Sequence, residues 1–420
     1  MTISLTRNGK RRVVVTGMAG ISPLGCDWPT VLAHLQSGQN AVRRMDDWAQ
    51  IKGLKSLVAA PAAPFELSAR YNRRTMRSMF RGSLMAVRAT EWALEDAGLI
   101  NEAWIHEGAM GVSYGACAGD PNGVREIASL ATNLSTKELN ATTYVRFMSH
   151  TAPVNIGVFF EVTGRVITTS SACTSGSQGI GYAYEAVADG RQRAMIAGGS
   201  EDMCPANTAV FDTLFAASTG FNDRPDLTPK PFDKDRDGLV LGEGAGTLIL
   251  EDLESALARG ATIYAEVAGF ATNSDGRHIT NPDSDRMRDV MREALEVAGM
   301  KPEDVGYVNA HGTATLHGDV AESRAVEAVF GDRVPMSTLK GFMGHTLGAC
   351  GALEAWMSIE MMRAGWFAPT CGLANPDPEC GKCDYIMGEG RPITTDVVMS
   401  NNFAFGGINT SLIFKRWTGA

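Results

Sequence analysis

One sequence plan occurs twice in this chain, and it restricts the folds that the chain can adopt. Residues 166–190 and 335–365 each contain an apolar strand, a turn of small residues and a helix rich in glycine and alanine. Polar, glycine-bearing sequence near a further strand follows each copy. We therefore predict two duplicated halves related by a pseudo-two-fold axis. Cys173 and His345 should occupy equivalent positions at the starts of the two helices, which such an axis brings together.

Short apolar strands alternate with helices along the whole chain, which is typical of an α/β fold. The 420 residues and the 44% hydrophobic content suffice for a large core. We place the two halves at residues 1–256 and 257–420. The pattern of apolar residues also predicts one long helix over residues 73–97.

Composition and charge argue against several classes of protein. The net charge of −9 disfavours nucleic acid as the main partner. We find no apolar run that is long enough to span a bilayer, and a first core strand over residues 12–16 explains the N-terminus better than a signal peptide does. The eight cysteines are scattered, unlike those of a secreted disulfide framework. The simplest class is a soluble, cytoplasmic enzyme.

The turn in the first copy carries a cysteine. Cys173 lies in Thr-Ser-Ser-Ala-Cys-Thr-Ser-Gly-Ser-Gln, between an apolar strand and a helix of small residues. At a helix N-terminus the backbone N–H groups and the helix dipole favour a thiolate, and the same N–H groups can hold an oxyanion. This context indicates a nucleophile. The segment alone leaves open a buried structural cysteine, which is how most free cysteines behave.

Two histidines follow strand ends in the second half. His311 ends a strand and enters a loop with two threonine hydroxyls, and Lys340 precedes His345 at the start of a helix. The helix N-terminus should keep His345 neutral, and a neutral imidazole can donate its Nε2–H to an enolate oxygen. Either histidine alone would be a structural hydrogen-bonding group. Together with Cys173 at the matching strand end, they predict catalysis.

Four other patterns resemble ligand sites but fit them poorly. The spacing of His311 and His317 across a loop matches no common zinc motif. Residues 233–238 begin like an EF-hand loop, but the required glutamate comes one residue too early. Residues 242–246 lack the last glycine of a dinucleotide motif and run into a strand. The Cys-Gly-Lys-Cys segment 380–383 lacks a second cysteine pair, so a loop is the better interpretation.

A basic cluster interrupts this acidic sequence. Its arginines would share one face of a helix by three- and four-residue spacing. They are Arg70, Arg73, Arg74, Arg77 and Arg81. One interpretation is a solvated face. The other is a docking surface for an acidic partner, which such a concentration of positive charge in a chain of net charge −9 makes competitive.

At these residues the chain resembles the elongating β-ketoacyl-acyl carrier protein synthases, a family of thiolase-fold condensing enzymes. The resemblance runs nearly end to end, and its separate motifs occur in the family's order. They are Val15–Gly25, Ser171-Ala-Cys173, Ala197-Gly-Gly-Ser200, Pro231–Gly238, His311-Gly-Thr313, Lys340, Gly344-His345 and Asn402–Gly407. The resemblance implies a five-layered αβαβα sandwich of two similar halves, normally a homodimer.

The resemblance also implies a mechanism. Cys173 would take an acyl group from the phosphopantetheine of a carrier protein, with its own N–H and that of Phe405 as the oxyanion hole. A malonyl carrier would then lose carbon dioxide, and His311 and His345 would stabilise the enolate that attacks the acyl-cysteine. Lys340 would keep the surrounding region in order. No cofactor is implied beyond the phosphopantetheine that the substrates carry.

Further roles follow from the same resemblance. The pantetheine arm would bind Thr313 and Thr315, and Phe405 with Phe403 would gate the acyl pocket. The surface for docking an acidic acyl carrier protein would comprise Arg73, Arg74, Arg77 and Arg81. A structural sodium or potassium ion, as in some relatives, would be held by Asn309, Glu354, Ser400 and Asn401.

The chain departs from the family's pattern in places. The usual Asn-Ser-Phe-Gly-Phe-Gly-Gly reads Asn-Asn-Phe-Ala-Phe-Gly-Gly over residues 401–407. Ala404 replaces a flexible glycine, so a stiffer gate could change the range of chain lengths or the gating kinetics. His317 lies in a usually variable loop, and Cys350 replaces a common alanine, which indicates core packing. These differences hint at a specialised pathway, such as polyene or polyketide synthesis, rather than housekeeping fatty-acid elongation.

Other functions must be weighed against this one. The chain-length subunit of a ketosynthase heterodimer typically lacks the active cysteine, and a thiolase has a second cysteine where this chain has Phe403-Ala-Phe405. A cysteine hydrolase would need water at the acyl-enzyme, and two histidines with a lysine fit decarboxylation better. We therefore expect a decarboxylating condensing enzyme, either a homodimer or a heterodimer with a related subunit.

Overall fold

The computed structural model describes residues 4–419. An 11-stranded mixed sheet organises the fold, and pairing of β3 with β11 joins its two sets of strands. In spatial order the first set is β7 (Val166–Thr169), β6 (Met110–Gly115), β8 (Ala194–Glu201), β10 (Gly244–Asp252) and β3 (Val13–Ile21). The second set is β13 (Pro335–Ser337), β12 (Tyr307–Asn309), β17 (Val397–Ala404), β18 (Ile408–Arg416) and β11 (Ala265–Ser274), with β15 (Asp384–Tyr385) beyond β13.

The two sets of strands repeat one topology. In the first set, β10 lies between β3 and β8 and is antiparallel to both. In the second set, β18 lies between β11 and β17 and is antiparallel to both. The remaining neighbours are parallel in both sets. This repetition confirms the predicted duplication. The helix α8 (Leu253–Ala258) lies across the expected boundary at residue 256, which stays a prediction.

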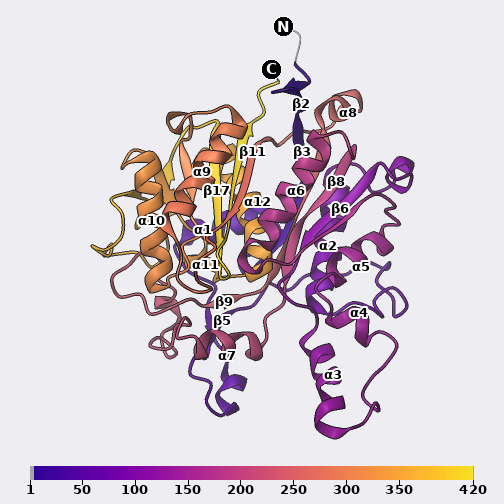
Figure 1. Cartoon of the computed structure of the whole chain (residues 1–420), viewed down its shortest axis with the longest axis vertical. Coiled ribbons are helices and arrows are strands. Elements are labelled where there is room, and N and C mark those ends of the chain that lie inside the picture. The colour runs from indigo at the N-terminus through magenta and orange to yellow at the C-terminus, as the bar shows by residue number, and fades with distance from the viewer. Residues whose placement is uncertain (1–3, 420) are drawn as a thin grey trace.

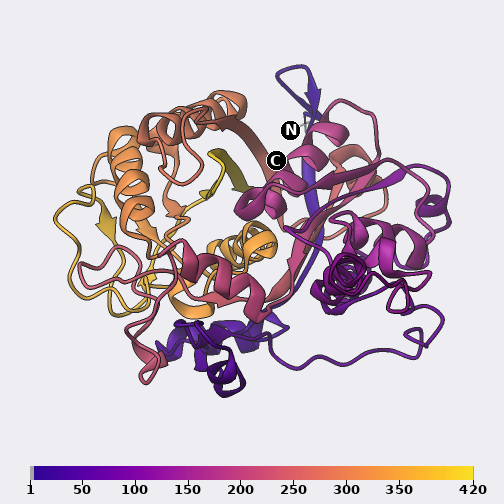
Figure 2. The same cartoon turned by 60° about the horizontal axis from the view of Figure 1, so that its bottom comes forward.

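Helices form the other three layers. The helices α2 (Arg81–Asp96) and α5 (Thr151–Phe159) cover the outer face of the first set of strands, and α9 (Ser284–Ala298) with α10 (Leu316–Phe330) covers the outer face of the second (Figures 1 and 2). Between the two sets lie α6 (Ser175–Ala188) and α12 (Cys350–Ala364), which contact each other and strands of both sets. The result is the five-layered αβαβα sandwich that the family resemblance implies.

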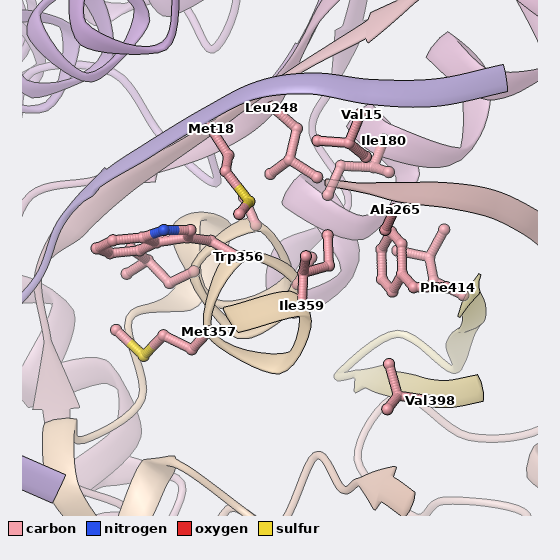
Figure 3. Packing of buried hydrophobic residues seen from close by; sticks show 14 of the residues in the cluster. Val15, Met18, Ile180, Leu248, Ala265, Trp356, Met357, Ile359, Val398 and Phe414 are labelled. Atoms are coloured by element: carbon pink, nitrogen blue, oxygen red, sulfur yellow. The ribbon is translucent and has the colours of Figure 1, made fainter. Parts of the chain in front are cut away.

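The core is centred on the two middle helices. Trp356 and Ile359 of α12 lie among apolar side chains from β3, β10, β18 and α6 (Figure 3). The two helices approach closely because each has a glycine in its first turn: a Cβ on Gly176 would lie 2.8 Å from the Gly348 carbonyl oxygen, and one on Gly351 would lie 2.6 Å from the Ser177 nitrogen. Glycine at these positions therefore brings the starts of α6 and α12 together.

The equivalence of Cys173 and His345 is wrong in detail. A short 3-10 turn precedes each central helix, at 172–174 before α6 and at 347–349 before α12. The first residue of each turn has a left-handed backbone, with φ of 52° at Ala172 and 45° at Leu347. Matching these turns pairs Cys173 with Gly348, and His345 lies in the preceding loop. The pseudo-symmetry still places both residues beside the same pair of helix starts.

The long helix predicted over residues 73–97 is also wrong at its start. The helix α2 begins only at Arg81, and residues 73–78 form turns. The Asn72 side chain accepts hydrogen bonds from the backbone nitrogens of Arg74, at 2.9 Å, and Thr75, at 3.2 Å. Such a local bond stabilises a turn in place of a helix. The arginines therefore do not share one helical face.

The remaining helices connect the layers. They are α1 (Trp28–Ser37), α3 (Pro121–Asn133), α4 (Thr143–Phe147), α7 (Pro205–Thr213) and α11 (Lys340–Met343). Local sequence determines their ends where caps are available: Asp27 accepts the Thr30 N–H before α1, and Gly38 ends that helix with a left-handed backbone. Within residues 4–419 no helix has the length and apolar character needed to cross a membrane.

Candidate active site

The turn before α6 presents Cys173 to a buried pocket. The preceding strand β7 ends at Thr169, and the Ser175 hydroxyl accepts the Ser171 N–H at 2.9 Å to tighten the turn. Cys173 is 5% exposed. The backbone N–H groups of Phe405 and of Cys173 itself lie near the thiol sulfur and act to lower its pKa. The expected strand-to-helix turn is thus present, and a second chain segment completes its pair of N–H donors.

Cys173 meets both predicted histidines. The Cys173 sulfur and one ring nitrogen from each of His311 and His345 lie within 4.8 Å of one another. The His345 Nε2 is 2.9 Å from the sulfur, and the two imidazole rings meet edge to face at 5.1 Å between centroids. The backbone of His345 is held by hydrogen bonds to Val240 and from Gly242. Fold topology, rather than local sequence, therefore brings these three side chains together.

The site favours neutral forms of all three groups. Burial raises the pKa of the Cys173 thiol to about 11, although nearby Lys340 and the two backbone N–H groups act against this rise. Burial and the charge of Lys340 lower the pKa of both His311 and His345 well below the usual value. The expected neutral His345 is consistent with this direction. The raised pKa of Cys173 runs against the thiolate expected at the helix N-terminus, because burial has a larger effect on this pKa than the backbone N–H groups have.

The proton of neutral His345 has a defined place. The Leu347 N–H donates to His345 Nδ1 at 3.3 Å, so Nδ1 is an acceptor and the proton belongs on Nε2. That nitrogen faces the Cys173 sulfur.

A thiolate and two imidazoles are also a donor set that zinc prefers. The adjacent positive charge of Lys340 disfavours a cation at this position.

A buried ion pair lies behind the histidines. The Lys340 ammonium bonds the Glu354 carboxylate, and the side chains are 1% and 0% exposed, respectively. The other Glu354 oxygen accepts a hydrogen bond from Asn402 at 2.7 Å. Lys340 thus lowers the pKa values of the histidines without bonding either ring.

Two further residues belong to this network and were not predicted from the sequence. Glu322, on α10, accepts the backbone N–H groups of His311 and Gly312 at 2.6 and 2.7 Å. Burial raises the pKa of Glu322 to about 8. Asn402 contacts both Glu354 and the His311 ring. For Glu322 the only signal in the sequence is a glutamate on the helix that follows the His311 loop. For Asn402 the signal is the asparagine in place of the serine of the family motif.

A cavity of about 370 Å³ leads to the cysteine from the surface. Its lining includes the three catalytic candidates, and the Thr313 and Thr315 hydroxyls are 3.0 Å apart on one wall. The rim includes residues 278–282 and 316–318. A narrow, partly apolar channel with hydroxyls along its wall suits a flexible arm that carries amide groups.

Two aromatic side chains flank the reactive groups. The Phe405 ring lies 5.8 Å from that of Phe211 on α7, and the Phe403 ring lies 6.3 Å from that of His311. Strand β17 continues through Ala404, whereas Gly406 and Gly407 have positive φ values of 99° and 71°. The turn after the two aromatics therefore depends on the glycines that this chain retains.

The four residues expected to hold a monovalent cation divide into two groups. Asn309 donates to the Ser400 hydroxyl at 3.3 Å, and Asn309 also contacts Glu354. Asn309 Oδ1 is buried and has no hydrogen-bond partner in the described chain, as a cation ligand would require. The Asn401 side chain instead contacts Met291 on α9, on the opposite face of the sheet. The donor set fits a cation only if Asn401 contributes its backbone oxygen.

The expected docking arginines also divide. Arg73, Arg74 and Arg77 are exposed on the turns before α2. The Arg81 guanidinium pairs with Glu243, with Nε 2.9 Å from a carboxylate oxygen, and that pairing offsets its charge. Arg81 is also exposed, with a 48% exposed side chain, but it is paired. The exposed basic cluster, whose charges have no ion-pair partner among residues 4–419, therefore comprises Arg73, Arg74 and Arg77, which do not lie on a helix.

Known proteins show the same fold and domain order. The family model for the N-terminal domain of β-ketoacyl synthases matches residues 10–256, and that for the C-terminal domain matches residues 264–374. The 3-oxoacyl-[acyl-carrier-protein] synthase 2 of Rhizobium meliloti (strain 1021) is 35% identical over 422 residues, which cover 97% of this chain and 100% of the relative.

Solved structures agree with these likenesses. A β-ketoacyl synthase from Burkholderia phymatum STM815 is 53% identical with a TM-score of 0.95, and the match covers 97% of this chain and 99% of that one. The ishigamide ketosynthase/chain length factor is 29% identical with a TM-score of 0.86, over 97% of this chain and 100% of that one. By fold, by site and by these likenesses, the chain belongs to the β-ketoacyl synthase family, the condensing acyltransferases of fatty-acid and polyketide synthesis.

Proposed function

We propose that this protein extends acyl chains by decarboxylative condensation and that Cys173 carries the growing chain. One observation supports these assignments above the others. The Cys173 sulfur lies 2.9 Å from His345 Nε2 and beside two backbone N–H groups, in a pocket that also contains His311.

In the first half-reaction the Cys173 sulfur attacks the thioester carbonyl of an acyl carrier. The new C–S bond replaces the bond to the pantetheine sulfur, and the thiol proton ends on that leaving sulfur. The tetrahedral oxyanion would accept hydrogen bonds from the N–H groups of Cys173 and Phe405, which lie near the sulfur in the free site. Reaching the thiolate at a raised pKa requires the incoming substrate or a proton acceptor to assist.

In the second half-reaction the histidines would stabilise an enolate. The bond between the malonyl α-carbon and its free carboxylate breaks, carbon dioxide leaves, and the electron pair forms the thioester enolate. Neutral His311 and His345 would each donate an Nε2–H to the enolate oxygen. The α-carbon then attacks the acyl-Cys173 carbonyl, and the cysteine leaves and regains a proton. Thr313 and Thr315, on the cavity wall, would bind the pantetheine arm.

The gate is tested by restoring the family's glycine. We propose that Phe405 and Phe403 close the acyl pocket, and Ala404 between them restricts the backbone. Ala404→Gly should increase the rate of Cys173 acylation by long acyl carriers severalfold and should destabilise the protein by about 0.5–1 kcal/mol. Rapid-quench acylation over a series of chain lengths measures this effect.

Ala271→Gly is the matched control for the gate, because Ala271 lies in a strand and is 8% exposed against 9% for Ala404. Equal acylation rates for Ala404→Gly and the unchanged protein at every chain length would exclude a role of Ala404 in gating.

The exposed basic cluster is our proposed docking surface for an acidic acyl carrier protein. Replacing Arg74 and Arg77 by glutamate should raise KM for the carrier by about tenfold at low salt, with less effect at high salt. Arg333→Glu is the control, since Arg333 lies in the loop between α10 and β13, has a 62% exposed side chain and pairs with exposed Glu303. A KM for the charge-reversal variant that matches the control at all salt concentrations would contradict this surface.

Three further assignments are proposals. We infer a homodimer in the cytoplasm, supported by the homodimer that the family resemblance implies and by eight free cysteines. A heterodimer with a related subunit is the second candidate, because one similar structure is a ketosynthase/chain length factor.

A sodium or potassium ion with a structural role would be held by Asn309, Glu354 and Ser400 together with the backbone of Asn401.

Intact mass spectrometry tests the proposed function. The protein is mixed with acyl carrier proteins that bear chains of different length, and the adduct is mapped by peptide digestion. We expect one acyl group on Cys173 and a preference for some chain lengths. A folded protein that forms no adduct with any acyl carrier, or forms one elsewhere, would overturn the assignment.

A further inference from the structure

We infer that Asn402 is a positioning residue that determines which nitrogen of His311 carries the proton. This inference rests on the proposed function, in which the Nε2–H of His311 faces the substrate. Asn402 lies on β17, is fully buried and stands where the family motif has serine.

The direction of each hydrogen bond follows from the chemistry of the partners. The Asn402 Nδ2 lies 2.7 Å from Glu354 Oε2 and 3.3 Å from His311 Nδ1. Glu354 is paired with the Lys340 ammonium, so its free oxygen acts as an acceptor and turns the NH₂ side of the amide toward itself. The amide nitrogen of asparagine donates two hydrogen bonds and accepts no hydrogen bond. The Cys350 sulfur, 3.7 Å from the same nitrogen, is a weaker acceptor than an imidazole nitrogen at 3.3 Å. The second hydrogen therefore points to His311 Nδ1, which identifies Nδ1 as the bare nitrogen.

The opposite nitrogen of the ring is then the donor. His311 Nε2 is buried and has no hydrogen-bond partner among residues 4–419, and His311 lines the cavity that contains Cys173. A buried N–H without a partner is unfavourable, so this group is poised for an oxygen of a bound substrate. His345 reaches the same tautomer by a different route, through the Leu347 N–H.

The surroundings hold the Asn402 side chain in one place. A Cβ on Gly351 would lie 2.7 Å from Asn402 Oδ1, so the glycine in α12 makes room for the amide. The Asn402 backbone oxygen accepts the Thr410 hydroxyl at 3.1 Å, which fixes the strand at this position. Glu354 Oε2 and His311 Nδ1 are both within hydrogen-bond distance of the amide nitrogen. The serine of the family motif is too short to reach both groups at once.

Asn402→Asp reverses the hydrogen-bonding character of the side chain while its shape is kept. The new carboxyl oxygen would share one proton with Glu354, 2.7 Å away, and would have no second hydrogen to donate. It can therefore only accept from His311, which should draw the His311 proton to Nδ1 and leave Nε2 bare. We expect malonyl-carrier decarboxylation to fall by about 100-fold or more, as on loss of one oxyanion donor, with acylation of Cys173 changed less than threefold. Asn402→Ser should retain more activity than Asn402→Asp, because a hydroxyl can still donate to Nδ1.

The tautomer is measured directly by nitrogen–proton correlation NMR on protein with ¹⁵N-labelled histidine. The His311 signals, among those of seven histidines, are assigned with His311→Gln. We expect a protonated Nε2 and a bare Nδ1 in the unchanged protein, and the reverse in Asn402→Asp. Asn155→Asp on α5, a substitution of another buried asparagine, is the control and should leave the His311 pattern unchanged.

An Nε2–H tautomer of His311 that persists in Asn402→Asp would overturn the inference. So would equal loss of acylation and decarboxylation, because a general structural defect would affect both. A failure of the proposed function looks different: the unchanged protein would then fail to decarboxylate a malonyl carrier, while the NMR experiment would still report the tautomer.

Discussion

Cys173→Ala should abolish both acyl transfer and condensation, while decarboxylation of a malonyl carrier continues. The thiol sulfur is the only atom removed, and the proposed enolate donors on His311 and His345 remain in place. Without the sulfur no acyl-enzyme can form, so the enolate has no electrophile and takes up a proton. Intact mass and carbon dioxide release, measured on the same samples, separate the two steps.

Cys350→Ala is the matched control for this prediction. Cys350 is buried beside the nucleophile, with its sulfur 3.2 Å from the Cys173 carbonyl oxygen, and the family commonly has alanine there. We expect this variant to acylate normally. An acyl adduct that persists in Cys173→Ala, or full condensation by Cys173→Ser, would remove Cys173 from the mechanism.

Lys340→Met should destabilise the protein by about 3–5 kcal/mol, because it leaves Glu354 buried without its counter-charge. Removing the ammonium also removes a cause of the lowered pKa values of His311 and His345. Decarboxylation should therefore fall most at the acidic end of the pH profile, where the histidines would gain protons. Urea denaturation measures the free energy of unfolding, and carbon dioxide release measures the rate.

The pH dependence of this loss has a defined sign. Burial raises the pKa of Glu354 above its ordinary value of 4.5, and loss of Lys340 removes an interaction that opposes the rise. The folded variant therefore holds the proton more tightly than the unfolded chain. The destabilisation should be small below about pH 4.5, where both states are protonated, and should grow as the pH rises above that value. A uniform loss at all pH values would contradict this explanation.

Lys382→Met is the control, since Lys382 is exposed. A surface substitution of this kind is expected to change the free energy of unfolding by no more than about 0.5 kcal/mol. A similarly small effect of Lys340→Met would show that the buried pair does not hold the site together.

The duplicated fold could be predicted because each copy carries its own local signals. An apolar strand, a turn of small residues and a glycine-rich helix are features of neighbouring residues, and they recur in both halves. The predicted equivalence of Cys173 and His345 was wrong by a few residues, because the true match depends on the positions of the left-handed residues Ala172 and Leu347. Such a turn is not evident from residue types alone, since neither position is a glycine.

Other misses have long-range or competing local causes. The helix over residues 73–97 was too long because the Asn72 side chain caps a turn that periodicity does not reveal. The helix N-terminus alone favours a thiolate at Cys173, but burial raises the pKa of the thiol, and burial depends on segments distant in sequence. Glu322 and Asn402 act through contacts between elements, so the sequence alone could not place them beside His311.

The most direct test of the account follows one carbon atom. The protein is given an acyl carrier and a malonyl carrier labelled with ¹³C at the free carboxylate, and the products are analysed by mass spectrometry. We predict a β-ketoacyl carrier two carbons longer than the acyl donor, without label, and one labelled carbon dioxide for each product. Label retained in the product, or equal elongation with an acetyl carrier in place of the malonyl carrier, would contradict decarboxylative condensation.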